Sequence, residues 1–447
     1  MELSVSINTV LYGVGVLVMI YAWRFLNWIW LKPKKMDKFL RQQGPNGNSY
    51  KFLYGEAKEM IHMITNAKLK PINLTDDIVP RVMPFVHKSI KTHGKGKVFF
   101  TWLGPQPVVH VTEGALIHEA LTNYSQFQKP IEGNPLTKLL ARGVASAEAD
   151  QWVKHRKILN PAFRVEKLKH MLPAFYVSCS EMISKWEELT KERSCEVDVY
   201  PHLQTFTRSR FLPTKNNRRM KENDRVVKAT IKKIINKRMT TMKAGESSSN
   251  DLLGILLDSN DKEIKQQGNK NFGLDVDEVI QECKLFYFSG QETTSNLLAW
   301  TMILLGQHTI WQERARDEVL KVFGERKPDI DGLSRLKVIT MIFHEVLRLY
   351  PPGISIRRMN HEEITLGNIT LPAGSFLELH MLLLHHDSDI WGNDVNDFKP
   401  ERFVEGVPKE ANALASYMPF GVGPRICIGK NFAMMEAKLA LLILHKL

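Results

Sequence analysis

The sequence is poor in cysteine. Four cysteines occur in 447 residues, and they are widely scattered, at Cys179, Cys195, Cys283 and Cys427. None forms a CxxC pair, and their spacing matches neither a zinc site nor a disulfide framework, which favours a reducing compartment. The bulk composition, with 43% hydrophobic and 24% charged residues, is that of a globular protein with a large core and excludes a disordered chain.

Motifs for nucleic-acid binding are missing, although the chain carries a formal net charge of +13. The densest basic stretch runs from Arg208 to Lys243. Its apolar residues recur at helical spacing, and most of its lysines fall on other faces, which predicts an amphipathic helix with a solvated basic side. The apolar positions are Val227, Ile231, Ile234, Ile235 and Met242. Because no zinc-finger, RNP or basic-zipper pattern accompanies it, an anionic membrane surface or an acidic protein is favoured as partner, with no nucleic acid.

Charge is absent from a long stretch near the N-terminus. Leu3 to Trp23 contains 21 uncharged residues, which is about 31 Å of helix and enough to span a bilayer. The basic residues follow it, so the positive-inside rule leaves the body of the protein in the cytosol. A cleaved signal peptide would carry its positive charge first and end in small residues, and neither holds here. We therefore expect residues 1–31 to be a retained, single-pass anchor in the endoplasmic reticulum membrane.

The remaining chain predicts a mainly α protein with small β-sheets, of the α+β class. Pro33 is expected to end the anchor helix and begin a basic and polar linker, residues 32–52, before one domain at residues 53–447. Residues 97–112 predict two strands joined by a Gly-Pro turn, and residues 364–384 show strand-like alternation. Helices are expected at residues 149–161, 165–190, 275–306, 309–323 and 335–349 and again after Gly429. Polar loops are expected at residues 244–250 and 260–273.

One cysteine stands in an unusual setting, the stretch "PFGVGPRICIGK" at residues 419–430. A lone cysteine is by default a small buried hydrophobic residue. Here, however, the glycines around Cys427 let the backbone fold tightly and point amide groups at the sulfur. Arg425 adds a positive charge that would hold a thiolate or a carboxylate. A thiolate presented from a glycine loop ahead of an apolar helix is what a proximal haem-iron ligand requires.

The same residues resemble a known signature. Phe420, Gly423, Arg425, Cys427 and Gly429 reproduce FxxGxRxCxG, the haem-binding signature of the cytochrome P-450 superfamily. The resemblance implies a cytochrome P-450 fold behind the N-terminal transmembrane helix. It also implies haem b (iron protoporphyrin IX) as cofactor, with Cys427 as the ligand of its iron.

Two further motifs resemble the same superfamily. "HEVLRLYPP" contains Glu345 and Arg348 in the spacing of its ExxR motif, and "FKPERF" contains Arg402 in its PERF box. A glutamate and an arginine three residues apart on a helix usually form a solvated pair. The resemblance instead implies that Glu345, Arg348 and Arg402 form a buried structural triad behind the haem.

A third motif lies in the apolar stretch "FYFSGQETTSN", residues 286–296. A glycine within a helix costs on the order of 1 kcal/mol, so Gly290 needs a reason. The resemblance implies that Gly290 opens a groove for dioxygen and that Glu292 and Thr293 carry protons to it. A kinked core helix would explain the threonines but not the acid beside them. Ser289 departs from the usual alanine or glycine at its position.

Haem propionates need cationic or polar partners. "WVKHR" resembles the WxxxR helix of the superfamily, which implies Trp152 and Arg156 as partners, with Arg425 as a third. On the strand after "LYPP" we choose Arg358. Arg357 stays open as the alternative, because the two residues are adjacent and the sequence alone does not fix which of them faces inward.

The anchor and several segments, among them "WVKHRKILNPAF" and "SGQETTS", resemble the plant clan numbered seventy-two of this superfamily, which includes secologanin-synthase-like enzymes. The resemblance implies a monooxygenase that inserts one oxygen atom from O2 into a lipophilic small molecule, a terpenoid in plant secondary metabolism. Its electrons would come from NADPH through a membrane-bound NADPH-cytochrome P-450 reductase. The acidic surface of that reductase would meet a basic face behind Cys427 that includes Lys430.

Two departures from the superfamily define an alternative. The chain is expected to lack some tens of residues near Thr207, and it stops at Leu447, inside the helix that follows the cysteine. The alternative is therefore a catalytically impaired or inactive truncated haem-binding protein. A haem-thiolate isomerase that needs no oxygen is disfavoured by Glu292 and Thr293.

Overall fold

The computed structural model describes residues 2–445 apart from residues 75, 94–96, 131–141, 191–214, 245–250 and 408–414. The expected gap at Thr207, as well as Cys195, therefore lies outside the described residues. The chain divides into two compact units. Unit 1 comprises Met1–Pro130, Gly353–Asn396 and Ala411–Met418, and unit 2 comprises Ile131–Pro352, Asp397–Glu410 and Pro419–Leu447.

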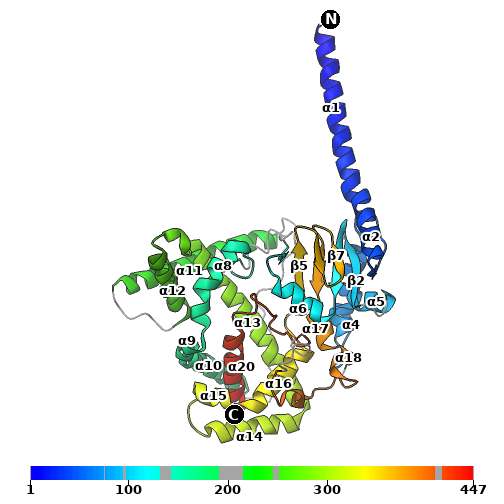
Figure 1. Cartoon of the computed structure of the whole chain (residues 1–447). Coiled ribbons are helices and arrows are strands. Elements are labelled where there is room, and N and C mark those ends of the chain that lie inside the picture. Colours follow the sequence, from blue (N-terminus) through cyan, green and yellow to red (C-terminus); the bar gives the residue numbers. More distant parts are fainter. Residues whose placement is uncertain are drawn as a thin grey trace. The chain divides into compact units, whose positions relative to one another are not determined.

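Unit 1 begins with a helix that runs through residue 42 (Figure 1). It consists of α1 (Glu2–Leu26), a π-helical segment (Asn27–Leu31) and α2 (Lys32–Gln42). Among the described residues, the stretch Leu11–Gln42 is the helix that is long and apolar enough to cross a membrane. The predicted break at Pro33 is wrong, because Pro33 lies in the first turn of α2, where its missing N–H is not needed. Residues 32–42 are therefore helical, and Pro33, Met36 and Leu40 are buried along α2.

A six-stranded sheet forms the core of unit 1, in the order β1-β2-β3-β8-β5-β4. The predicted hairpin is confirmed as β2 (Val98–Leu103) and β3 (Gln106–Val111), which are antiparallel. β8 (Phe376–Leu379) pairs parallel with β3 and antiparallel with β5 (Ile356–Asn360). The short strands are β1 (Asn46–Gly47) and β4 (Phe127–Gln128), and β6 (Ile364–Leu366) and β7 (Ile369–Leu371) form a separate hairpin.

The helices of unit 1 after α2 are short. They are α3 (Ala57–Leu69), α4 (Val79–Val82), α5 (Pro84–His93), α6 (Gly114–Thr122), α17 (Met381–His385) and α18 (Ser388–Trp391). The strand-like pattern predicted up to residue 384 is wrong at its end, where α17 replaces it. Met381, Leu382 and Leu384 are all buried there, and such a short apolar run does not distinguish a strand from a buried helix.

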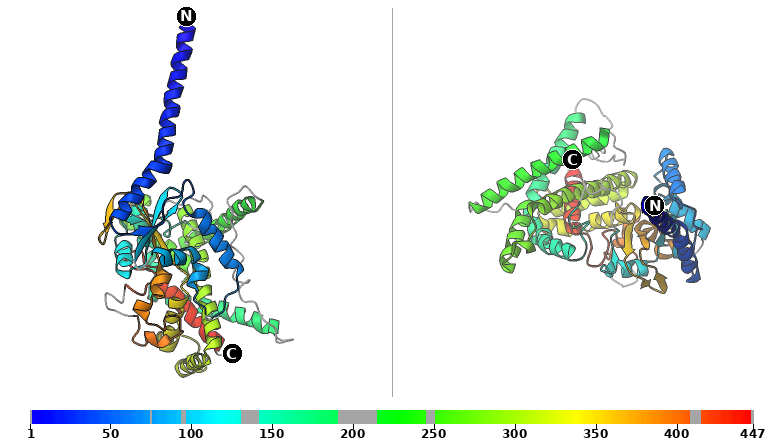
Figure 2. Two further views of the ribbon diagram at one scale, coloured as in Figure 1. Left: turned by 90° about the vertical axis from the view of Figure 1, so that its right-hand side faces the viewer. Right: turned by 90° about the horizontal axis from the view of Figure 1, so that it is seen from above.

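Unit 2 is helical, and the predicted helices are present in it. The described helices of three or more turns are α8 (Ala149–Leu159), α10 (Leu172–Thr190), α11 (Lys215–Lys243), α12 (Leu252–Gln267), α13 (Val276–Gln307), α14 (Thr309–Phe323), α16 (Lys337–Leu349) and α20 (Lys430–His445). Shorter ones are α9 (Val165–Leu168), α15 (Ile330–Arg335) and a 3-10 turn at Pro400–Phe403. α13 packs against α16 and α20, and α20 lies beside it in the views of Figures 1 and 2. The chain is thus mainly helical with small sheets, as predicted.

One local prediction in unit 2 is wrong, and another holds only in part. Residues 260–267 belong to α12 rather than to a loop, because buried Asn260 bonds the backbone of Leu274 and Lys262 pairs with Asp258 one turn away. α12 ends only at Gly268, which has a φ of 64°. In α11 the predicted apolar face is only partly buried, since Ile235 is enclosed whereas Ile234 is 51% exposed.

Candidate functional site

The candidate site of unit 2 is built around the loop that carries Cys427. Gly421 and Gly423 have φ values of 70° and 76°, a region that favours glycine. The loop is closed by a hydrogen bond from the Cys427 amide to the Phe420 carbonyl at 2.9 Å. α20 begins three residues after the cysteine. The two glycines therefore turn the chain so that the cysteine is presented just before an apolar helix.

The sulfur of Cys427 is surrounded by hydrogen-bond donors and positive charge. Burial raises the pKa of its thiol, while the backbone N–H groups of Gly429 and Lys430 and the charges of Arg156 and Lys430 lower it. The side chain nevertheless remains accessible to solvent. At Cys179 and Cys283, by contrast, burial and a neighbouring carboxylate raise the pKa to about 11. The pKa of Cys427 is raised overall, but among the described cysteines Cys427 is the one whose sulfur lies near both N–H donors and cations and is exposed to a ligand.

Two arginines and a tryptophan gather near Cys427. The Arg425 guanidinium carbon lies 4.6 Å from the centre of the Trp152 ring, and its Nη1 donates to the Ala147 carbonyl at 3.0 Å. Burial and the charge of Arg425 lower the pKa of Arg156, while the Cys427 thiolate acts in the opposite direction. The structure therefore brings Trp152, Arg156 and Arg425 together close to the cysteine.

Arg358 belongs to unit 1. It lies on β5 and is 4% exposed, whereas the side chain of Arg357 is exposed and its Nε lies 2.6 Å from Glu378 Oε2 on β8. Successive residues of a strand face opposite sides of the sheet, so only one of the two arginines can face inward. Arg358 is that residue, and its contact with a propionate remains a prediction.

The middle of α13 presents an open surface at Gly290, because a Cβ added there would meet no atom within 4 Å. Thr293 is exposed, and its hydroxyl donates to the Ser289 carbonyl at 2.6 Å. The threonine thus bonds back to its own helix, as in the alternative of a core helix, but it faces open space. Glu292 is half-buried beside it. When the hydrogen of a hydroxyl is bonded to a carbonyl, the lone pairs of its oxygen can still accept a hydrogen bond from another donor.

The charged triad predicted behind the site is assembled in unit 2. Arg348 donates to Glu345 through Nε at 2.8 Å and Nη2 at 2.7 Å, and both side chains are fully buried. Arg402 Nε lies 3.6 Å from Glu345 Oε1, and the Lys399 amide donates to the same oxygen at 3.0 Å. This geometry excludes a solvated helix pair.

These residues fit an iron porphyrin. Its iron would take the sulfur of Cys427, whose surroundings supply N–H donors, and its propionates would take the cations of Arg156 and Arg425. A flat ring needs a helix surface without side chains, which Gly290 offers.

Glu148 is a functional candidate that the sequence analysis missed. Its Oε2 lies 2.6 Å from Arg425 Nη2, so it orients one of the predicted cations and partly neutralises it. It stands at the N-cap of α8, four residues before Trp152. This closeness to the WxxxR motif in the sequence is the signal by which Glu148 could have been found.

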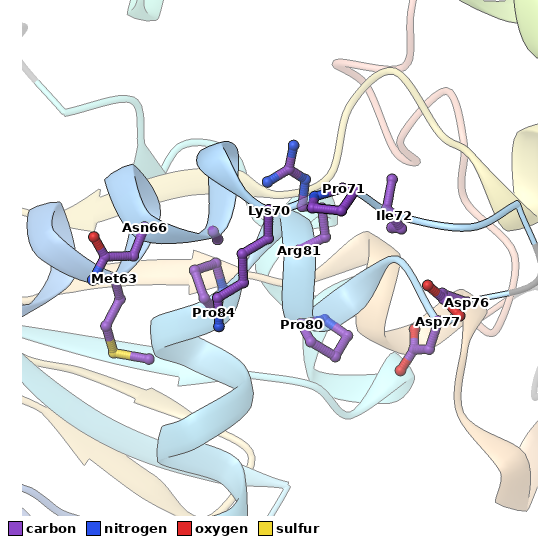
Figure 3. Close-up of a pocket in the computed structure, with 11 residues that line it drawn as sticks. Met63, Asn66, Lys70, Pro71, Ile72, Asp76, Asp77, Pro80, Arg81 and Pro84 are labelled. Carbon is purple, nitrogen blue, oxygen red and sulfur yellow. The ribbon is translucent and has the colours of Figure 1, made fainter.

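A separate hollow of about 520 Å³ lies in unit 1 between α3, α4 and α5 (Figure 3). Met63, Lys70 and Arg81 are among the residues that line it. Asp77 at its edge accepts the amide of Val79, so this carboxylate is already used within the fold. None of the site residues predicted from the sequence lines this hollow.

Comparison with known proteins places the chain in one family. The sequence model of cytochrome P-450 matches residues 80–209 and 205–445. The chain is 54% identical over 468 aligned positions to cytochrome P-450 CYP72A219 of Panax ginseng, with 95% of this chain and 90% of the relative covered. It is 46% identical over 491 positions to the 7-deoxyloganic acid hydroxylase of Catharanthus roseus, with 99% and 94% covered.

The comparisons also bear on the expected gap near Thr207. The two matches of the family model meet at residues 205–209. The alignments of 468 and 491 positions are longer than the chain of 447 residues, so gaps open within this chain. Both observations agree with an internal segment that the relatives have and this chain lacks.

Proposed function

The chain belongs to the cytochrome P-450 family, and we propose that it is a membrane-anchored haem-thiolate monooxygenase that inserts one oxygen atom from O2 into a lipophilic terpenoid. The observation that carries the proposal is the setting of Cys427. Two backbone N–H groups and two cationic side chains act on its sulfur, while the sulfur stays accessible. A thiolate in such a setting is the ligand that haem iron requires in this chemistry.

Each group of site residues has its own role in the proposed reaction. Haem, once ligated by a thiolate, supplies the activation of dioxygen. Cys427 would hold the iron, and Trp152, Arg156, Arg425 and Arg358 would hold the propionates. On α13, Gly290 keeps a helix surface clear, and Glu292 and Thr293 would hold a proton at the Thr293 hydroxyl and pass it on. The buried pair of Glu345 and Arg348 would keep the Cys427 side of unit 2 rigid.

Substrate class and electron supply rest on the relatives and on surface chemistry. One relative is named as a hydroxylase of 7-deoxyloganic acid, which supports an oxygenated terpenoid as substrate. Electrons would come from NADPH through NADPH-cytochrome P-450 reductase. Lys430, exposed at the start of α20, would contribute to the basic surface that this acidic partner meets.

The proposed location is the endoplasmic reticulum membrane, with the catalytic part in the cytosol. The apolar helix within Leu11–Gln42 supports a single crossing. The basic residues that follow the apolar stretch support the orientation.

A second candidate function is a haem-binding protein with impaired turnover. It is favoured by the meeting of the two family matches at residues 205–209, because a missing segment there would leave the substrate side less well closed to water.

One experiment tests both candidates. The full chain is expressed with haem and examined as its ferrous carbonyl adduct, and NADPH consumption and product are then measured with reductase and a terpenoid acid. We expect the red-shifted Soret band of a thiolate ligand, its loss in Cys427→Ser, and product formation coupled to NADPH. The band without product would favour the second candidate, and a protein without the band would contradict both.

A further inference from the structure

A buried histidine on α8 lies between two carboxylates of α13. Nδ1 of His155 is 2.5 Å from Glu282 Oε1, and its Nε2 is 3.2 Å from Glu278 Oε1. The side chains of His155 and Glu282 are 2% and 0% exposed. The preceding residue, Lys154, bonds both oxygens of Glu278 at 2.9 and 3.0 Å. Four side chains from two helices thus form one largely buried network.

The segment at residues 143–144 also contacts Glu282. The amide of Val144 donates to its Oε1 at 2.7 Å. A Cβ added at Gly143 would lie 2.7 Å from the Glu282 carboxyl carbon, so the chain at residue 143 closes directly over the carboxyl group. Burial raises the pKa of Glu282, whereas the bonds from His155 and Val144 lower it. A buried ion pair often contributes no more to stability than apolar residues of similar volume would, which suggests that this network has another role.

The position of the network on α13 indicates that role. Residues 7 and 11 positions apart lie on nearly the same face of an α-helix, so Glu282 shares a face with Ser289 and Thr293. Thr293 lies about 16 Å farther along the helix axis. His155 therefore bonds the face of α13 that displays Thr293. Since it bonds that face at Glu278 and Glu282, one turn apart, it opposes rotation of α13 about its axis.

α8 carries the predicted propionate-binding residues that lie near Cys427. Trp152 and Arg156 are one turn apart on α8 and lie next to Arg425. His155 directly precedes Arg156 and points about 100° around the helix from it. One face of α8 therefore gathers the cations near Cys427, and the next face holds α13.

We propose that His155 and Glu282, with Glu278 and Lys154, form a positioning network that sets the rotation of α13, and hence the aim of Gly290 and Thr293, relative to the cations on α8. The inference rests on the proposed function, because the aim of Thr293 matters only where a proton must be delivered. Glu278 and Glu282 lie outside the superfamily motifs matched in the sequence, and Lys154 and His155 occupy the unspecified positions of the WxxxR motif. None of the four residues is assigned contact with substrate or haem.

The test compares Glu282→Leu with Glu282→Gln in the full, haem-loaded chain with reductase. The leucine leaves Nδ1 of His155 and the Val144 amide without an acceptor, while the glutamine oxygen can still accept from both. We expect Glu282→Leu to release roughly tenfold more peroxide per NADPH at unchanged haem content, because small misplacements of reacting groups have effects of this size. Glu282→Gln should stay close to the unsubstituted chain. Equal peroxide release from all three proteins would overturn the proposal.

A second measurement separates positioning from stability. We expect Glu282→Leu to speed amide hydrogen exchange at residues 285–296 of α13 and to leave α16 unchanged, whereas equal acceleration in both helices would show a merely stabilising role. If Glu282→Leu does not fold, Glu282→Asp replaces it, since it keeps a carboxyl group but withdraws it by one carbon. Unchanged exchange and coupling in Glu282→Asp would then count against the network.

The matched control is Glu263→Gln. It removes an ion pair with Lys157, at 2.5 Å, that also starts from α8, and the lysine side chain of this pair is 55% exposed whereas that of Glu263 is 12% exposed. We expect no change in coupling or exchange, and a change as large as that of Glu282→Leu would contradict a specific role for Glu282. Should the unsubstituted chain lack the thiolate Soret band, the proposed function fails, and the exchange measurement still decides whether the network holds α13.

Discussion

Arg425 and Glu148 form an ion pair at the candidate site, with Nη2 of the arginine 2.6 Å from Oε2 of the glutamate. The Arg425 side chain is 4% exposed and that of Glu148 is 23% exposed, so water screens the pair only in part. A cation proposed to hold a propionate is therefore already shared with a carboxylate of this chain.

The first prediction concerns this shared cation. Glu148→Gln keeps an acceptor for Arg425 and removes the negative charge, so more of the arginine charge becomes available to a propionate. We expect haem to dissociate a few times more slowly. The measurement is transfer of haem to an excess of apomyoglobin. Faster transfer would show instead that the charge of Glu148 is needed to orient Arg425.

The second prediction concerns proton delivery. Thr293→Ala removes the exposed hydroxyl from α13, and we expect roughly tenfold more peroxide per NADPH at unchanged haem content, since general acid catalysis contributes effects of this size or larger.

Thr301 offers a matched control for that substitution. It lies on the same helix, is fully buried, and donates to the Leu297 carbonyl at 2.7 Å, as Thr293 does to Ser289. Thr301→Ala should leave the peroxide ratio unchanged. If both substitutions raised the peroxide ratio equally, the cause would be the lost hydrogen bond within the helix and not lost proton delivery.

The third prediction concerns the buried triad. Glu345→Gln leaves the charge of Arg348 without its buried counterpart, and breaking such a pair costs about 3–5 kcal/mol of the free energy of unfolding. Denaturant unfolding of the purified protein measures this loss. Asp258→Asn removes the exposed pair with Lys262 and should cost less than about 1 kcal/mol. A loss for Glu345→Gln as small as that of the control would argue against a structural triad.

The fourth prediction concerns Glu436 on α20. Burial raises its pKa from 4.5 to about 7, and a contact with Thr294 lowers it. Between pH 4.5 and 7 the folded state keeps a proton that the unfolded state has lost, so the free energy of unfolding falls as the pH rises through this window. Glu436→Gln should remove this fall and stabilise the protein by on the order of 2 kcal/mol at neutral pH. Parallel pH profiles of unfolding for the two proteins would contradict it.

Elements with strong local signals were predicted well. α13 begins with a capping box in which Asp275 and Glu278 bond each other's backbone, and its start and end lie within a residue or two of the prediction. The α14 range was predicted without error, and the hairpin of β2 and β3 turns at Gly104, whose φ is 59°. Such features depend on neighbours in the sequence, so the sequence suffices to find them.

Other features depend on contacts between distant residues. The continuation of α12 past residue 260 relies on Asn260 and its bonds to Leu274. His155 and Glu282 are 127 residues apart, and Arg425 and Glu148 are 277 apart. No periodicity in the sequence links such pairs. The residues of the Cys427 loop are predictable from their motif, whereas Glu148 and Glu282, which contact site residues or their neighbours from distant parts of the sequence, are not.

The helical path from Glu2 to Gln42 has a mechanical consequence. A flexible tether would absorb any change in the angle between the anchor and the bilayer normal, whereas a helix with Pro33 accommodated in its first turn transmits that angle. Apolar helices tilt more in thinner membranes. The thickness of the surrounding bilayer is therefore expected to turn α2, and the strand β1 that follows it, with respect to the lipid surface.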